Sequence, residues 1–140
     1  MPNSTRRAHI GLWILQGVLA ALFLFAGGFK LMLPAAALAQ ASPLPPLFLK
    51  LIALCEVAGA LGLVLPGALR IRQELTPLAA AGLTLIMAGA TVLTFATQGV
   101  APALFPLATG ILTTIVARGR GVAGHAPGGL GHGELRPAGR

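Results

Sequence analysis

The chain has 140 residues, of which 56% are hydrophobic and 9% are charged. Soluble domains carry about 25% charged residues, and a short chain has a large surface to cover, so the composition excludes an ordinary soluble domain and predicts a protein in lipid. The net charge of +7 is gathered in short clusters between apolar runs. Such clusters are typical of membrane-flanking charge and argue against a nucleic-acid partner.

Four apolar runs predict an all-α integral membrane protein, a bundle of four transmembrane helices. A helix needs about 20 apolar residues, within a range of about 17 to 25, to cross the hydrocarbon core of a bilayer. The predicted spans are residues 10–33, 47–65, 78–96 and 101–117. The first run, with arginines before it and Ala-Leu-Ala at 37–39, also imitates a cleaved signal peptide. Signal peptides have a shorter apolar region of about 7 to 15 residues, so an uncleaved span is the better interpretation.

The remaining segments are predicted to lie outside the bundle. Residues 1–9 form a short N-terminal segment, and prolines mark the connection at 34–46. Residues 118–140 are rich in glycine, carry scattered charges and have no apolar face to bury. This last segment is therefore predicted to be a disordered tail.

The basic residues predict the orientation of the bundle. Neither the connection at 34–46 nor the turn at 97–100 contains a lysine or an arginine. The basic clusters at the other helix ends are formed by Arg6, Arg7, Arg70, Arg72, Arg118 and Arg120. By the positive-inside rule, both termini and the connection between the second and third spans are cytoplasmic.

Small and hydroxyl residues are predicted to hold the helices together, because lipid tails are as apolar as leucine and give no hydrophobic drive for association. Threonines can bond across helices or back to their own carbonyl groups. The threonines concerned are Thr84, Thr91, Thr94, Thr109 and Thr113. The residues predicted to pack closely are Gly17, Gly27, Gly59, Ala60, Gly62, Gly82 and Gly89.

Glu56 is the most informative residue, because it lies near the middle of the second span. A charge at that depth costs at least about 2.5 to 3.5 kcal/mol. The carboxyl group must therefore face protein or water, and either pair with a cation or take up a proton. Glu56 is the strongest site candidate in the chain.

Two lysines could pair with Glu56. Lys50 precedes it by six residues on the same helix and points about 120° away, so Lys50 is expected to extend its amine to the interface. Lys30 lies beside Gly27 on a small-residue face that can approach the second span closely. It is also about 9 Å nearer the membrane edge than Glu56, so pairing requires a longer first helix or a tilt. For Lys30, pairing and extension to the interface both stay open.

These residues resemble a known family. The stretch AGGFKL at the end of the first span and CEVAGALGLVLP in the second, within a compact four-span chain, are similar to the DoxX and DoxX-like membrane proteins. The resemblance covers about residues 10–118 and assigns the family's lysine to Lys30 and its glutamate and small residues to Glu56, Gly59 and Ala60. It implies a small multi-pass protein of the bacterial or archaeal cell (inner) membrane. Some relatives are subunits of thiosulfate:quinone oxidoreductase or of other membrane redox assemblies.

Three classes of function fit the sequence. A redox role would need an electron carrier, but Cys55 has no partner thiol and the histidines lie outside the spans, so no cofactor or metal site is evident and enzyme activity stays open. A quinone could still bind between helices beside a redox partner. An intramembrane carboxylate also marks proton or small-solute transporters, which with so few spans would require a homo-oligomer. The favoured interpretation is a non-catalytic membrane subunit of a larger assembly, in which Lys30 and Glu56 fix helix register.

Overall fold

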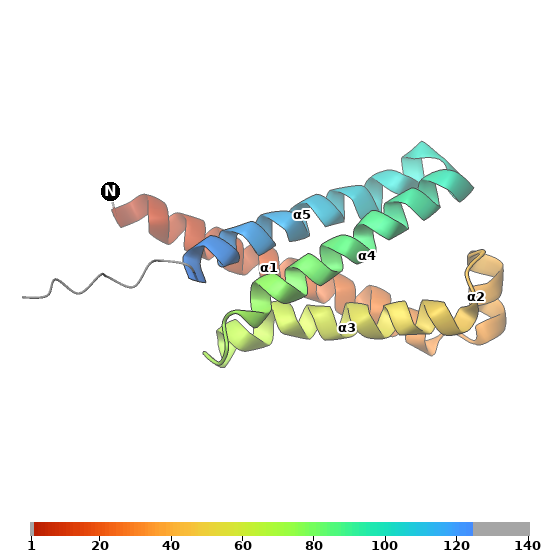
Figure 1. Cartoon of the computed structure of the whole chain (residues 1–140), viewed down its shortest axis with the longest axis horizontal. Helices are drawn as coiled ribbons and strands as arrows, with labels where there is room; N and C mark the ends of the chain where they lie inside the picture. Colours follow the sequence, from red (N-terminus) through yellow and green to blue (C-terminus); the bar gives the residue numbers. More distant parts are fainter. Residues whose placement is uncertain (1, 125–140) are drawn as a thin grey trace, which may run out of the picture.

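The computed structural model describes residues 2–124, and this part of the chain is helical throughout except for short connections (Figure 1). Four of its helices are long and apolar enough to cross a membrane. The helices are α1 (Pro2–Met32), α2 (Ala35–Ala41), α3 (Pro46–Ala68), α4 (Leu75–Gln98) and α5 (Val100–Gly124). The predicted all-helical bundle of four spans is therefore confirmed.

The bundle consists of two helix pairs. Helix α1 packs along α3, and α4 packs along α5, while α3 and α4 join the pairs. Figure 1 shows the two ends of the bundle. One end holds α2 and the turn between α4 and α5, and is called the α2 end below. The other holds the start of α1, the α3–α4 connection and the end of α5; it carries Arg70, Arg72 and Arg120 and is called the arginine end.

All four long helices run further at the arginine end than hydropathy indicated, and α1 and α5 do so most. Helix α1 begins at Pro2, not at residue 10, and α5 continues to Gly124, not to 117. Residues 118–124, expected in the disordered tail, are thus helical, and the rest of that segment lies outside the described residues. Hydropathy locates only the part of a helix that lies in lipid, whereas the hydrogen-bonded backbone can continue into the polar interface.

Helix α2 was not predicted. It follows Pro34, which has extended backbone angles of φ −65° and ψ 151°, and its sequence is AAALAQA. Alanine is the best helix former, so this run between prolines had a local signal for a helix. Helix α2 packs on α3 and buries Leu38.

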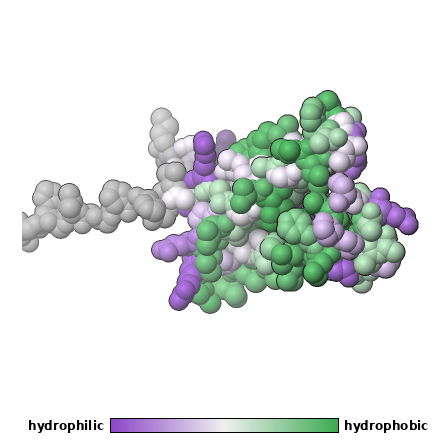
Figure 2. All heavy atoms as spheres, turned by 45° about the vertical axis from the view of Figure 1, so that its right-hand side comes forward, coloured by the Kyte–Doolittle hydropathy of each residue, from purple (hydrophilic) through white to green (hydrophobic). Residues whose placement is uncertain are grey.

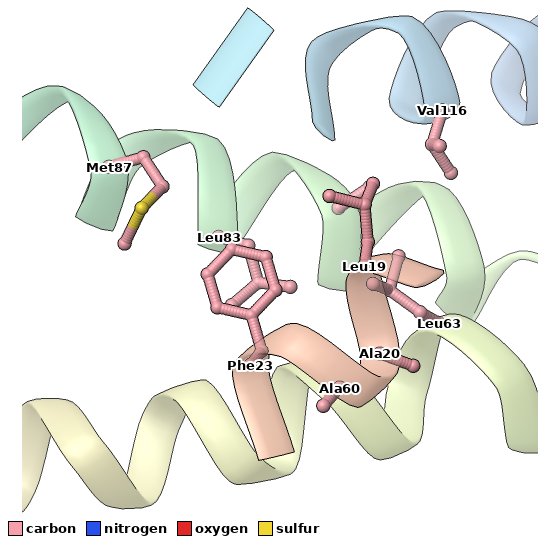
Figure 3. Packing of buried hydrophobic residues seen from close by; sticks show 9 residues of the cluster. Leu19, Ala20, Phe23, Ala60, Leu63, Leu83, Met87 and Val116 are labelled. Atoms are coloured by element: carbon pink, nitrogen blue, oxygen red, sulfur yellow. The ribbon is translucent and has the colours of Figure 1, made fainter. Parts of the chain in front are cut away.

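The core lies midway between the two ends and draws on all four long helices. Figure 3 shows Phe23 and Leu19 of α1 facing Leu83 of α4 and Leu63 of α3. The buried cluster comprises Leu19, Ala20, Phe23, Ala60, Leu63, Ala80, Leu83, Met87 and Val116. Many large apolar side chains are exposed instead, as expected of a surface in lipid. Figure 2 shows hydrophobic residues over most of the face in view and hydrophilic residues toward its ends.

Several predicted packing residues lie at helix contacts. A Cβ atom added to Gly59 would lie 2.7 Å from the Leu83 side chain, and one added to Gly62 would lie 2.7 Å from Ala79 Cβ, so both glycines let α3 approach α4. Ala60 lies in the core cluster. Between α4 and α5, Thr84 Oγ1 and Thr113 Oγ1 are 2.9 Å apart.

The predicted packing of Gly17, Gly82 and Gly89 is wrong for this bundle. A Cβ atom added at any of these positions would meet nothing within 4 Å. In α4 the larger side chains of Leu83 and Met87 face the core. Gly82 lies one residue before Leu83 and Gly89 two residues after Met87. At about 100° of rotation per residue, both glycines therefore point away from the core.

Candidate functional site

Lys30 and Glu56 form an ion pair between α1 and α3. The Nζ atom of Lys30 donates to both carboxylate oxygens of Glu56, at 2.8 Å to Oε1 and 2.9 Å to Oε2. The Glu56 side chain is 2% exposed and that of Lys30 is 35% exposed. The carboxylate is thus enclosed and neutralised, while part of the lysine can still be reached from outside the pair.

Gly27 makes this contact possible. A Cβ atom added to it would lie 2.8 Å from the carbonyl oxygen of Ala53, 2.9 Å from Val57 Cγ2 and 3.2 Å from Glu56 Cβ. Only a residue without a side chain lets the two helices approach this closely. Lys30 follows Gly27 by three residues and therefore lies on the same side of α1.

The structure pairs Lys30 with Glu56 although α1 is not extended. Helix α1 ends at Met32, so the expected 9 Å difference in depth (about six residues of helix rise) is closed by the placement of α1 against α3. Hydropathy gives the length of a span but not how far two spans slide or tilt past each other. Lys50 makes no ion pair with any group in residues 2–124, as its direction on α3 predicted.

A cavity of about 290 Å³ adjoins the ion pair at the α2 end. All four long helices line it: Lys30 comes from α1, Glu56 from α3, Thr94 from α4 and Thr109 from α5. The hydroxyl group of Thr109 donates to the carbonyl of Phe105 at 2.9 Å. Gln98 adds an amide group to the lining. A few polar groups in a largely apolar cavity can orient a small polar ring or solute.

The described residues offer no metal site. Within residues 2–124, no three His, Cys, Asp or Glu side chains lie close enough to hold a metal ion.

A second polar cluster, at the arginine end, was missed by the sequence analysis. Gln16 of α1 is buried; its Nε2 donates to the carbonyl of Leu63 at 2.6 Å. Its Oε1 accepts from Arg120, from Nε at 2.8 Å and also from Nη2. The Arg120 guanidinium lies 5.4 Å from the centre of the Trp13 ring. An amide side chain inside an apolar span was the available signal, because polar residues there need partners.

Comparison with known proteins shows a family. The sequence model of the DoxX-like family matches residues 14–116, which extend from α1 to α5 and include Lys30, Glu56 and the small residues between them. No curated protein and no solved structure matches the chain.

Proposed function

The chain belongs to the DoxX-like family of multi-pass membrane proteins, and from this premise we propose that it is a non-catalytic subunit of a larger assembly in the cell membrane. The observation that supports this role is the closed ion pair. Both oxygens of Glu56 are bound by Lys30, so the buried charge is already balanced within the chain. A pair satisfied in this way fixes the register of α1 on α3.

The test is whether other membrane proteins depend on this one. Membranes are extracted with an amphipathic polymer from cells with and without the chain, and membrane protein abundances are compared. A subunit role predicts that a specific partner is depleted when the chain is missing, and that it is restored by the wild-type chain. The Lys30→Met variant should restore it poorly. A chain that extracts alone and whose loss changes the abundance of no other membrane protein contradicts the proposal.

The cavity beside the ion pair supports a second candidate, binding of a quinone head group. Ligand pockets start at about 300 Å³, so a cavity of about 290 Å³ suits a single ring. Lys30 is partly exposed and can donate a hydrogen bond to a ring carbonyl of the quinone. Glu56 can exchange a proton with the quinone. Electron transfer itself would then belong to the redox partner.

This candidate is tested by titrating a short-chain quinone into the purified protein and following its melting temperature. Stabilisation by the quinone should be lost in Lys30→Met and kept in Glu74→Gln, which changes a carboxylate at the opposite end. Equal stabilisation of both variants would show that quinone partitions into detergent or binds elsewhere.

A further inference from the structure

The arginine end holds a larger cavity, of about 980 Å³. It is bounded by α1, the α3–α4 connection, the start of α4 and the end of α5. Three guanidinium groups line it, from Arg70, Arg72 and Arg120, together with one carboxylate, from Glu74. Its lining is therefore positive even when the imidazole of His9 is neutral.

Two of these arginines have no charge partner among the described residues. The side chains of Arg70 and Arg72 make no hydrogen bond or ion pair within residues 2–124, with Glu74 or any other group. Both have left-handed backbone angles, with φ of 54° and 40°. Such angles are uncommon for residues other than glycine, and strained positions of this kind cluster at binding sites.

The third arginine is held in place. Arg120 gives two of its N–H groups to Gln16, so three of the five donors of its guanidinium stay available. It stacks on Trp13, whose ring packs against Gly67, where an added Cβ atom would lie 2.9 Å from the ring. This part of the cavity is a rigid donor surface.

The surroundings favour an anion that carries apolar chains. Leu69 and Ile71 flank Arg70 and are exposed, at 61% and 59%, so apolar and basic side chains alternate where the chain leaves α3. The cavity also includes Thr76 and Pro77 in the first turn of α4, where the helix dipole is positive. Arginine forks match phosphate oxygens, and basic pockets between transmembrane helices bind anionic lipid head groups.

We propose that this cavity binds the phosphate group of an anionic phospholipid. Arg70, Arg72 and Arg120 bind the phosphate, and the acyl chains lie along the apolar surface beside Leu69 and Ile71. The site lies at the opposite end of the bundle from the Lys30–Glu56 pair and does not depend on the function proposed for that pair.

The full-length protein in a neutral detergent tests this. Phosphatidylglycerol is added and the melting temperature is followed, with native mass spectrometry as a second measurement of retained lipid. Zwitterionic phosphatidylcholine is the lipid control. We expect phosphatidylglycerol to raise the melting temperature and to stay bound, and phosphatidylcholine to do neither.

The variant Arg70→Gln with Arg72→Gln should weaken phosphatidylglycerol binding roughly 25-fold, because each basic residue near an anionic lipid surface contributes about 1 kcal/mol, or a factor of about five. Its melting temperature without lipid should be unchanged, since neither side chain has a hydrogen-bond or ion-pair partner within residues 2–124. The matched control is Arg6→Gln with Arg7→Gln, which removes the same charge from the start of α1, outside the cavity lining. This control should bind lipid as the wild type does.

Three results would overturn the proposal. Equal stabilisation by phosphatidylcholine would show that lipid acts as a solvent only. Equal weakening in the Arg6 and Arg7 variant would show diffuse attraction to the whole surface. If glycerol 3-phosphate, which lacks acyl chains, stabilises the protein as well as phosphatidylglycerol does, the ligand is a soluble phosphate ester and not a lipid.

Discussion

The two ends of the bundle treat charge in opposite ways. At the α2 end, one cation meets one carboxylate, and Glu56 is 2% exposed in its side chain. At the arginine end, three guanidinium groups share a wide cavity with a single carboxylate that binds none of them. A balanced pair can be buried because each charge satisfies the other. Unbalanced charges must stay near water or lipid head groups, where a ligand of opposite charge can neutralise them.

The region between the ends explains why they can differ. Leu19, Phe23, Leu63 and Leu83 are almost fully buried and pack together in the core (Figure 3). Phe23 also lines the cavity beside the ion pair. The polar contacts at this core layer include the hydrogen bond from Gln16 Nε2 to the Leu63 carbonyl and the bond between Thr84 and Thr113 that joins α4 and α5. The two cavities share no lining residue.

The sharpest test of the comparison is the side of the membrane on which each end lies. Charge asymmetry predicts that the arginine end is cytoplasmic. Single cysteines at Gln40 in α2 and at Gln73 in the α3–α4 connection, in a Cys55→Ser background, leave the charge pattern unchanged. An impermeant thiol reagent added to intact cells should label Gln40→Cys fully and Gln73→Cys only after lysis. The reverse pattern would invert the bundle.

Breaking the ion pair should have the largest effect on stability. Lys30→Met leaves a buried carboxylate without its cation and should cost about 1 to 3 kcal/mol, unless Glu56 takes up a proton. Adding Glu56→Gln should recover part of that loss. The measurement is a double-mutant cycle on denaturant unfolding in one detergent. Lys50→Met serves as the control, because Lys50 has no ion pair in the part of the chain that the structure describes. Additive effects of Lys30→Met and Glu56→Gln would argue that the pair does not couple.

The pair shows what sequence can and cannot predict. The cost of burying a carboxylate singled out Glu56. Gly27, three residues before Lys30, indicated that Lys30 could come close enough to pair with Glu56. The sequence could not decide between pairing and extension to the interface, because that depends on how α1 is placed against α3. Gly17, Gly82 and Gly89 failed as packing positions for the same reason: a small residue permits a close contact, but only the rotation of its helix decides whether a neighbour is there.

The arginine end was harder to predict. Hydropathy marked the spans but stopped short of the helical extensions of α1 and α5, where the interface begins. Arg120 was counted only as a charge that sets orientation, yet it binds Gln16, which is 104 residues away in the chain. Contacts between such distant positions leave no local pattern. The apolar sequence around Gln16 was a signal that its amide needs a partner, but it does not indicate which one.

An effect of similar size should follow from closing the gap between α1 and α3. In Gly27→Ala the new methyl group would meet the Ala53 carbonyl oxygen at 2.8 Å, and overpacking of this kind costs about 1 to 3 kcal/mol. Gly28→Ala is the matched control, because nothing lies within 4 Å of its Cβ position. It should be neutral or gain up to about 1 kcal/mol from lower backbone entropy in the unfolded state. Equal melting temperatures for the two variants would show that α1 and α3 are not held close at Gly27.

The smallest effects should come from shortening the chain at the arginine end. Removing residues 125–140, which the sequence predicts to be disordered, should leave the free energy of unfolding unchanged within about 0.5 kcal/mol. Removing residues 118–140 also deletes Arg120 and leaves the buried Oε1 atom of Gln16 without its donor, which should cost about 1 to 2 kcal/mol. Thermal unfolding in detergent compares the two truncations. The variant Arg120→Leu in the full-length chain separates the side chain from the rest of the segment. If it matches the longer truncation, the Gln16–Arg120 contact accounts for the loss; if it behaves as wild type, the helical extension of α5 stabilises the bundle by other contacts.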